Sequence, residues 1–410
     1  KVLPLYFKIK KINVMNSIRN INFAGKKALV RVDFNVPVDN GQITDDTRIR
    51  EALPTIEKLL SDGASVILMA HFGRPKKGGF EPELTLKPVV DYLSKMINKP
   101  VAFTQSLDFK DIKALADGLG AGDVMMIENI RFYAGETKGD EELAKNLSEL
   151  GDCYVNDAFG AAHREHSSTA TIARFFPNDK YFGLLMENEI VNLNRLMTSP
   201  KKPFTAIIGG SKISSKIDVI QNLLPLVDNL IIGGGMSYTF AKARGKNIGN
   251  SICEDDKLQV ALDLVEQAKQ RGVNLYLPVD IMAGDSFSND CNVKYCPDVE
   301  IPDGWEGMDA GEKTRELFRE VILKSETILW NGPVGVFEFE TFSKGTDAIA
   351  KAVAEASDKG AFSAVGGGDS VAAINKSGYA DRVSYISTGG GAMLEFLEGK
   401  TLPGIKAIMD

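Results

Sequence analysis

Short apolar segments alternate with amphipathic helical patterns along the whole 410-residue chain, and each apolar segment ends in a glycine or polar turn. The segments cover residues 27–33, 64–70, 123–129, 153–158, 204–210, 228–234, 273–280, 327–332, 361–367 and 382–388. Helical patterns such as IREALPTIEKLLSDG and DKLQVALDLVEQAKQRG lie between them. Near-continuous apolar strands are typical of parallel sheets that are buried on both faces. The alternation therefore predicts an α/β fold built from doubly wound, Rossmann-like parallel sheets.

The length predicts two such domains joined by a helical hinge, because a single core rarely grows beyond about 250–300 residues. The segment GLLMENEIVNLNRLMTSPKKP reads as a long helix with a proline-containing end. We therefore expect residues 185–203 to link an N-terminal domain, 15–184, to a C-terminal domain, 204–394. We expect residues 395–410 to pack back toward the N-terminal domain. Residues 1–14 precede Met15 and have no long apolar region, so we interpret them as an artificial leader or a mis-assigned start.

Composition excludes several classes of protein. No run of about 18 apolar residues occurs, which disfavours a transmembrane helix. The formal net charge of -7 disfavours nucleic-acid and membrane-surface partners and permits a monomer. The four cysteines form no CxxC pair, so reduced thiols in a cytoplasmic protein are a simpler interpretation than a zinc site.

Basic and polar residues follow the predicted strands of the first half. The motifs are RVDFNVP with Asp33 and Asn35, the helix start DDTRIREA with Arg48, HFGRP with His71 and Arg74, ENIRF with Arg131, and NDAFGAAHREH with His163 and Arg164. Ligands of open parallel sheets bind beyond the carboxyl ends of the strands. Arginine binds phosphate and carboxylate groups bidentately. The pattern predicts a site for a small polyanion that also offers a hydroxyl group to Asp33.

Each of these residues taken alone also has a simpler interpretation. Asp33 and Asn35 suit a turn at a strand end, and the arginines suit ordinary exposed surfaces. A cation in the first turn of a helix opposes the helix dipole, however, so Arg48 requires a neighbouring anion. Four separate strand or helix ends that each supply an arginine favour one shared site.

Glycine-rich turns follow the strands of the second half. The sequence GGSKISSK spans residues 209–216, and GGG occurs at residues 233–235, 366–368 and 389–391. Lys212 and Lys216 are four residues apart, so we expect them to share one face in the first turn of a helix, where backbone N–H groups favour phosphate. Glycine runs let a flat base approach the backbone, although each run also suits a tight strand-to-helix turn. Together they predict a nucleotide site.

Two carboxylates and one set of amides complete this second pattern. Glu338, in WNGPVGVFE, is a candidate for binding ribose hydroxyls, and Asp369 is a candidate carboxylate near magnesium. The amides of residues 389–391 precede a predicted helix and form a candidate anion nest. The P-loop motif GxxxxGK[ST] is absent from the chain.

These motifs stand in the order that is found in phosphoglycerate kinases. The chain resembles that family from about residue 16 to its C-terminus through RVDFNVP, HFGRP, ENIRF, NDAFGAAHR, GGSK, IIGGGM, WNGPVGVFE, GGGD and STGGGA. The resemblance implies reversible phosphoryl transfer in glycolysis, from 1,3-bisphosphoglycerate to MgADP, giving 3-phosphoglycerate and MgATP. It therefore implies phosphoglycerate and ADP or ATP as substrates, with Mg2+ as the cofactor.

The resemblance also implies a role for individual residues. Phosphoglycerate would be bound by Asp33, Asn35, Arg48, His71, Arg74, Arg131 and Arg164. The nucleotide would be bound by Gly210, Lys212, Lys216, Gly234, Gly307, Asn331, Pro333, Glu338, Gly367, Gly368, Asp369 and Ser370, with Asp369 placing Mg2+. The catalytic residues would be Arg48, Lys212, Gly368 and Gly391. Ser215 and Ser370 stand where the family often has an acid and a threonine, which puts nucleotide affinity in doubt but removes no required group.

The expected mechanism is charge neutralisation without a covalent enzyme intermediate. A phosphoryl group in transfer needs positioning and cations more than it needs a base. The expected cations are divided between the two halves of the chain, so closure of the lobes should accompany the reaction.

Two other functions share parts of this pattern. A nicotinamide dehydrogenase would need GxGxxG with an acidic residue about 20 residues later, and we do not find that combination. A binding protein without catalysis would need one ligand set rather than cations in both halves. An assay that couples ATP consumption to 3-phosphoglycerate distinguishes an enzyme from a binding protein.

Overall fold

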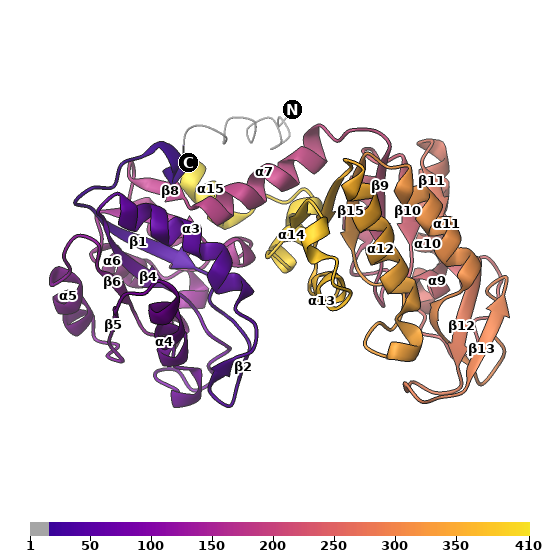
Figure 1. Ribbon diagram of the computed structural model, residues 1–410, viewed down its shortest axis with the longest axis horizontal. Helices are drawn as coiled ribbons and strands as arrows, with labels where there is room; N and C mark the ends of the chain where they lie inside the picture. Colours follow the sequence, from indigo (N-terminus) through magenta and orange to yellow (C-terminus); the bar gives the residue numbers. More distant parts are fainter. Residues whose placement is uncertain (1–15) are drawn as a thin grey trace. The chain divides into compact units, whose positions relative to one another are not determined.

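The computed structural model describes residues 16–410, which form two compact units (Figure 1). Unit 1 contains the described residues up to Val191 together with Thr401–Asp410, and unit 2 is Asn192–Lys400. The predicted leader, residues 1–14, lies outside the described residues. The segment that returns to unit 1 begins at Thr401 rather than at residue 395, because α14 (Gly391–Leu397) packs against α8 (Ile217–Leu223) in unit 2.

Unit 1 is built on one parallel sheet with the order β5-β6-β4-β1-β7-β8. The predicted strands are confirmed as β1 (Lys27–Val32), β4 (Ser65–Met69), β6 (Val124–Met126) and β7 (Cys153–Asp157). The two edge strands, β5 (Val101–Phe103) and β8 (Lys180–Phe182), were not predicted, because a segment of three residues is too short to show a periodic pattern. The short hairpin of β2 (Val38–Asp39) and β3 (Gln42–Ile43) was not predicted either.

Amphipathic helices cover this sheet. In α3 (Thr47–Ser61), the buried residues Ile49, Ala52, Ile56 and Leu59 recur every three or four positions and pack into the core with β1 and β4. The other helices are α4 (Lys87–Met96), α5 (Phe109–Asp117), α6 (Glu141–Ser148) and α15 (Pro403–Met409). Helix α7 (Leu184–Thr198) begins in unit 1 and continues into the sequence of unit 2. Short 3-10 helices are η1 (Ile18–Asn20), η2 (Pro82–Leu84), η3 (Ile130–Phe132), η4 (Glu136–Lys138), η5 (Phe159–Ala161) and η6 (Thr171–Phe175).

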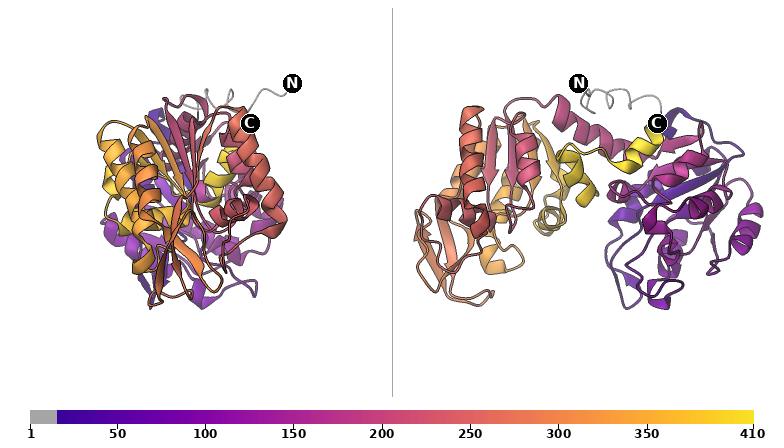
Figure 2. Two further views of the ribbon diagram at one scale, coloured as in Figure 1. Left: turned by 90° about the vertical axis from the view of Figure 1, so that its right-hand side faces the viewer. Right: turned by 180° about the vertical axis from the view of Figure 1, so that it is seen from behind.

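Unit 2 repeats this architecture with the parallel order β11-β10-β9-β15-β16-β17. The strands are β9 (Phe204–Ile208), β10 (Asn229–Ile232), β11 (Asn274–Tyr276), β15 (Thr327–Asn331), β16 (Phe362–Val365) and β17 (Tyr385–Ile386). In the left view of Figure 2 these strands lie between two layers of helices. The two parallel sheets confirm the predicted fold class.

The helices of unit 2 are α8, α9 (Met236–Ala243), α10 (Leu258–Gln270), α11 (Glu312–Leu323), α12 (Lys344–Asp358), α13 (Gly368–Lys376) and α14, with η7 (Asp255–Lys257), η8 (Glu340–Phe342) and η9 (Ala380–Arg382). Among residues 16–410, none of the helices combines the length and the apolar character needed to cross a bilayer.

A second, antiparallel sheet in unit 2 was not predicted. It contains β12 (Asp280–Gly284), β13 (Val293–Pro297) and β14 (Glu306–Ala310) in the order β13-β12-β14. The prediction of one strand over residues 273–280 is wrong, because β11 ends at Tyr276 and Asp280 already begins β12. Four of the five residues of β13 are exposed, so that strand has no apolar run that a sequence pattern would detect.

Buried aspartates fix the N-termini of three helices. The Asp157 carboxylate accepts a hydrogen bond from the Met186 amide in the first turn of α7, at 3.1 Å. Asp280 accepts from the Thr314 amide of α11 at 2.8 Å, and Asp309 accepts from the Gly345 amide of α12 at 2.9 Å. Burial raises the pKa of Asp157 and of Asp309 to about 7. Each of these three contacts joins a strand to the first turn of a helix that comes later in the chain.

The C-terminal segment completes unit 1. The Gly404 amide donates to the Ala162 carbonyl at 2.8 Å, and the Asn156 side-chain amide donates to the Gly404 carbonyl at 3.3 Å. The Asn16 side chain donates to the Ile408 carbonyl at 2.8 Å. Residues from both ends of the described chain therefore lie in the same unit.

The order of strands in each sheet locates a crevice for ligands. In unit 1 the chain winds from β1 toward β5 and then restarts on the other side with β7; in unit 2 it winds from β9 toward β11 and restarts with β15. Doubly wound sheets bind ligands at such switch points, beyond the carboxyl ends of the two central strands. Residues that follow β1 and β7, or β9 and β15, are therefore the first candidates for a site.

Candidate active site

The segment that follows β1 forms one wall of the candidate site in unit 1. Arg48, in the first turn of α3, donates to the Asp33 carboxylate at 3.2 Å and to the Asn35 carbonyl at 3.0 Å. The Asn35 side chain accepts from the Gly73 amide at 2.8 Å. Asp33 is thus the anion that offsets the unfavourable position of Arg48 at a helix N-terminus. These contacts join the segments that follow β1 and β4.

His71 is almost fully buried, and its Nδ1 atom lies 4.0 Å from an Asp33 carboxylate oxygen. Its Nδ1 atom lies 3.1 Å from Nη2 of Arg31, a residue of β1. Burial holds the pKa of His71 well below its usual value, and the nearby charges of Arg31, Arg131, Arg48 and Arg164 lower it further. Three of the predicted arginines, together with Arg31, therefore act on one neutral imidazole.

Arg131 is a partly buried member of this group of cations. Its Nη1 group donates to the Gly73 carbonyl at 2.6 Å, while its buried Nε has no hydrogen-bond partner. Burial and the charges of Arg164 and Arg31 lower the pKa of Arg131 to about 10, so the guanidinium stays protonated at neutral pH. A buried donor without a partner beside like charges is the chemistry of an anion site.

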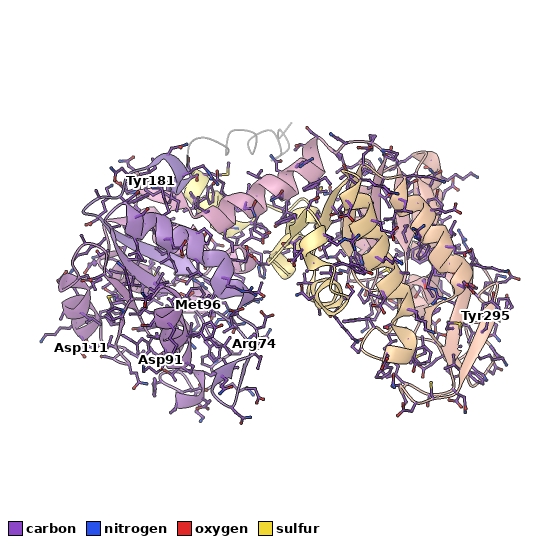
Figure 3. The ribbon with its side chains drawn as sticks, viewed as in Figure 1. Arg74, Asp91, Met96, Asp111, Tyr181 and Tyr295 are labelled. Carbon is purple, nitrogen blue, oxygen red and sulfur yellow. The ribbon has the colours of Figure 1, made fainter. Side chains whose placement is uncertain are left out.

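The structure brings together Asp33, Asn35, Arg48, His71, Arg131 and Arg164. Arg74, labelled in Figure 3, follows in the same loop and is exposed. Among residues 16–410, no hydrogen bond or ion pair joins Arg74 to the other members of the set, so its role stays a prediction. His163 accompanies the set as the neighbour to which the Arg164 Nε donates, at 3.1 Å.

In unit 2, a cavity of about 460 Å³ lies beyond the ends of β9, β10 and β15. Six of the predicted nucleotide residues line it: Gly210, Gly234, Gly307, Pro333, Glu338 and Asp369. Tyr238, Ile252, Phe287 and Met308 form an apolar part of the wall that sequence reasoning missed. Those residues carry no motif, because they come from α9, from loops and from the unpredicted antiparallel sheet. An apolar wall with a few polar groups suits a flat base with a ribose.

Two of these glycines are required by close approach. A Cβ atom on Gly234, whose φ is +69°, would lie 2.7 Å from the Pro333 carbonyl oxygen and 2.9 Å from the Gly210 nitrogen. A Cβ atom on Gly307 would lie 2.3 Å from the Tyr238 ring. Any side chain at either position would push the cavity walls apart.

Lys216 and Asn331 form a polar group beside this cavity. The Lys216 ammonium donates to the Asn331 side-chain oxygen, and the Asn331 side-chain amide donates to the Gly366 carbonyl at 2.8 Å. Burial lowers the pKa of Lys216, while the negative charges of Asp369 and Glu398 raise it. The Ser370 hydroxyl accepts from the Gly332 amide at 2.5 Å. These bonds tie the end of β15 to the start of α13.

The prediction that Lys212 and Lys216 share a helix face is wrong. Helix α8 begins at Ile217, Lys216 is its N-cap residue, and the exposed Lys212 lies in the turn before it. A contact with a distant residue holds this turn outside the helix: the Glu254 carboxylate accepts hydrogen bonds from the Ser214 amide, at 3.0 Å, and from the Ser214 hydroxyl. The sequence pattern does not show this contact. Lys212 therefore lies in a loop, and Lys216 lies at the N-terminus of α8.

The glycine runs after β16 and β17 open helices, as expected. Gly368 is the first residue of α13 and Gly391 the first of α14, with Gly367 and Gly390 as N-caps at φ values of 92° and 49°. The Gly389 amide already donates to the Ser387 hydroxyl at 3.1 Å. Of the three backbone amides predicted to bind an anion, this one therefore already has a partner within the protein.

Asp369 is the carboxylate that could hold a metal ion beside phosphates. It lines the cavity, and its charge acts on Lys216. Among residues 16–410, no three His, Cys, Asp or Glu side chains form a cluster that could hold a metal ion on their own. A single carboxylate fits Mg2+, which usually binds proteins through one or two carboxylates and takes its remaining ligands from substrate phosphates and water.

Sequence reasoning also missed the groups behind the unit 1 site. Arg31 is 1% exposed and Glu136 is fully buried, and both contact Ser168. A charged residue inside the apolar strand KALVRV was the available signal for Arg31. Glu136 lies in a short 3-10 helix and offered no such signal.

Comparison with known proteins agrees with this geometry. The family model described as phosphoglycerate kinase matches residues 18–400. A curated phosphoglycerate kinase of Porphyromonas gingivalis is 53% identical over 417 residues, which covers 96% of this chain and 99% of that protein. The chain therefore also covers nearly the full length of this relative.

Solved structures give the same result. The phosphoglycerate kinase of Coxiella burnetii is 42% identical with a TM-score of 0.86, over 96% of this chain and 98% of that one. The phosphoglycerate kinase of Pyrococcus horikoshii is 32% identical with a TM-score of 0.79 over the same shares. Sequence, fold and family match agree across the chain, which belongs to the phosphoglycerate kinase family, the glycolytic kinases that act on phosphoglycerate and ADP or ATP.

Proposed function

We propose that unit 1 binds phosphoglycerate and that unit 2 binds the nucleotide in the kinase reaction of this family. The convergence of Arg48, Arg131 and Arg164 around the neutral His71 supports the first assignment. The cavity of unit 2, which is lined by glycines and by Glu338, supports the second. The proposed phosphoglycerate set is Asp33, Asn35, Arg48, His71, Arg74, Arg131 and Arg164. The proposed nucleotide set is Gly210, Lys212, Lys216, Gly234, Gly307, Asn331, Pro333, Glu338, Gly367, Gly368, Asp369 and Ser370.

The residues of unit 1 bind and orient a polyanion. Arg131 offers an unpaired Nε donor, and Arg164 adds a second cation near it. Asp33 would repel a phosphate but accepts a hydrogen bond from a hydroxyl group, which phosphoglycerate supplies. Because Asp33 also holds Arg48 at 3.2 Å, a substrate hydroxyl bound there would be fixed relative to that guanidinium.

The chemical step requires charge neutralisation more than proton transfer. An oxygen of the ADP diphosphate is already ionised at neutral pH and needs no base to attack the acyl phosphate. The bond from phosphorus to the attacking oxygen forms, and the bond to the carboxylate oxygen of 3-phosphoglycerate breaks. Arg48, Lys212, Gly368 and Gly391 are the proposed catalytic residues, because cations and helix N-termini stabilise the moving phosphoryl group. Lobe closure stays a prediction.

We propose that Asp369 binds Mg2+ together with the nucleotide phosphates. The bound ion supplies positive charge that offsets the charge of the phosphate oxygens. Lys216, held by Asn331 at the start of α8, adds a second positive charge from the protein.

We also propose that the protein acts as a monomer in the cytoplasm, without nucleic-acid or membrane partners. The net charge of -7 and the four free cysteines support this assignment.

A pair of variants tests the division of ligands between the units. Arg48→Ala should lower turnover by at least about 100-fold, the scale of one lost electrostatic donor, while the affinity for ADP stays unchanged. Lys216→Ala should weaken ADP binding more than 3-phosphoglycerate binding. Titration calorimetry of each ligand, with a coupled assay of ATP and 3-phosphoglycerate consumption, measures both. Loss of ADP binding in Arg48→Ala would contradict the assignment of the units.

A further inference from the structure

A buried carboxylate lies behind the unit 1 site and has no place in the mechanism above. Glu136 begins η4 and is fully buried. Its Oε1 atom accepts from the Ser168 hydroxyl at 2.6 Å, and its Oε2 atom accepts from the Ser168 amide at 3.0 Å. Burial raises the pKa of Glu136, whereas Arg31, the bonds from Ser168 and Arg131 lower it. A carboxylate is costly to bury, so these partners must stabilise its charge.

Ser168 connects this carboxylate to Arg31. The Ser168 hydroxyl has one proton, which it donates to Glu136, and its lone pairs accept from the Arg31 Nε at 2.9 Å. Glu136 therefore sets the direction of the hydroxyl group, and the hydroxyl group fixes the plane of the guanidinium. Arg31 also donates to the Val32 carbonyl, so its position in β1 is held at two points.

Arg31 in turn determines the tautomer of His71. Its Nη2 group lies 3.1 Å from Nδ1 of His71, and a guanidinium can only donate. Nδ1 must therefore accept, which places the imidazole proton on Nε2. The Asp33 carboxylate would favour the other tautomer, but its oxygen lies 4.0 Å from Nδ1, beyond hydrogen-bond distance.

We infer that Glu136 is a positioning residue for the phosphoglycerate site: through Ser168 and Arg31 it holds His71 as the tautomer that donates from Nε2. This inference rests on the proposed function in one respect, namely that His71 contacts phosphoglycerate. An imidazole locked in this form offers the substrate a donor at all times, whereas a mixed population would offer an acceptor part of the time and would repel an anionic oxygen.

The tautomer can be measured directly in the full-length protein. A two-bond ¹H–¹⁵N correlation spectrum distinguishes protonated from unprotonated ring nitrogens, and the chain has only three histidines to assign. The spectrum of His71→Gln identifies the signals of His71. We expect the unsubstituted protein to show Nε2 protonated and Nδ1 bare. A protonated Nδ1, or a mixture of both forms, would overturn the inference without any further variant.

Two variants then test the connection through Ser168. Ser168→Ala removes the hydroxyl without changing charge, and Glu136→Gln removes the carboxylate charge; if the second fails to fold, the first still decides. We expect His71 to become a mixture of tautomers in both, and the KM for 3-phosphoglycerate to rise by about tenfold, the scale of one lost hydrogen bond to a charged group. The KM for ATP should stay unchanged.

Glu141→Gln is the matched control. It makes the same change of charge on α6 of the same unit, at an exposed carboxylate that pairs with Arg174 at 2.7 Å. We expect neither the tautomer nor the KM to change in this control. An unchanged tautomer in Ser168→Ala would overturn the connection itself. A changed tautomer with an unchanged KM would overturn the positioning role and would place the error in the proposed contact between His71 and phosphoglycerate.

Discussion

Replacement of the buried Asp157 should make unit 1 more stable at alkaline pH. The Asp157 carboxylate lies at the start of α7, where Oδ1 accepts from the Met186 amide at 3.1 Å and Oδ2 has no partner. Burial dominates the pKa of this group, although Thr55 and the amides of Met186 and Leu185 favour its charged form. Gly183 leaves room for it, because a Cβ atom there would lie 2.1 Å from Oδ1. Asp157→Asn keeps an oxygen for Met186 and replaces the unpartnered oxygen with a neutral amide. We therefore expect the substitution to remove a buried charge at little cost in hydrogen bonding.

The magnitude follows from the pKa of this group. Burial raises the pKa of Asp157 from 3.8 to about 7, a difference of about 3 pH units. At about 1.4 kcal/mol per unit this corresponds to about 4 kcal/mol. Between these two pKa values the native state binds more protons than the unfolded state, so the free energy of unfolding falls as pH rises from about 4 to about 7. We expect Asp157→Asn to match the parent protein near pH 4 and to exceed its stability by about 2–4 kcal/mol at pH 8.

Hydrogen exchange of individual amides tests this locally. The opening free energy of the Met186 amide, corrected for intrinsic exchange, should fall with pH in the parent protein and stay constant in Asp157→Asn. Urea unfolding at pH 5, 6, 7 and 8 provides a global measure. Asp179→Asn is a suitable control, because it removes a half-exposed carboxylate that pairs with Lys26 at 2.6 Å. A difference between parent and variant that does not change with pH would refute the reasoning.

Three further predictions concern the two candidate ligand sites. Gly234→Ala should weaken ADP binding, because its Cβ atom would lie 2.7 Å from the Pro333 carbonyl oxygen. Gly245 also has a positive φ, but a Cβ atom there would have no other atom within 4 Å, so Gly245→Ala should bind ADP normally. Calorimetric titration compares the two variants. Asp369→Asn should raise the Mg2+ concentration needed for half-maximal activity by about tenfold without changing the KM for 3-phosphoglycerate. Asp381→Asn, at an exposed position, should change neither quantity. Equal Mg2+ dependence in both variants would contradict the role of Asp369. Arg131→Lys should raise the KM for 3-phosphoglycerate by about tenfold, and by more at alkaline pH. The burial that lowers the pKa of Arg131 to about 10 would lower the pKa of a lysine into the measurable range, so the lysine would lose its charge as pH rises. A pH profile of the KM measures this effect, with Arg174→Lys at an exposed position as the control.

The sequence was most informative where a residue broke a pattern. An arginine at a helix start is locally unfavourable, so the position of Arg48 predicted a neighbouring anion, which the structure identifies as Asp33. The glycine runs after strands predicted a nucleotide site, and Gly210 and Gly234 line the cavity of unit 2. The parallel sheets were predicted because central strands are apolar on both faces. In the structure Arg131, Arg164, Gly210 and Gly234 follow the carboxyl ends of β6, β7, β9 and β10.

What the sequence could not predict depends on contacts between distant segments. Lys212 and Lys216 have helical spacing, but Glu254 bonds to Ser214 and holds that turn outside the helix. The apolar wall of the nucleotide cavity comes partly from an antiparallel sheet whose outer strand is exposed. Glu136 is distinguished only by its burial beside Ser168, and burial of a single acidic residue leaves no periodicity to detect.

The return of the last ten residues to unit 1 has a consequence for synthesis on the ribosome. Unit 2 is continuous in sequence, so it can finish folding as soon as residue 400 has emerged. Ala162 and Asn156 acquire their partners on Gly404 only after that point, although they were translated far earlier. Ala162 stands two positions before Arg164, so the proposed phosphoglycerate site matures last. A chain truncated after Lys400 should therefore contain a completed unit 2 and an unfinished unit 1.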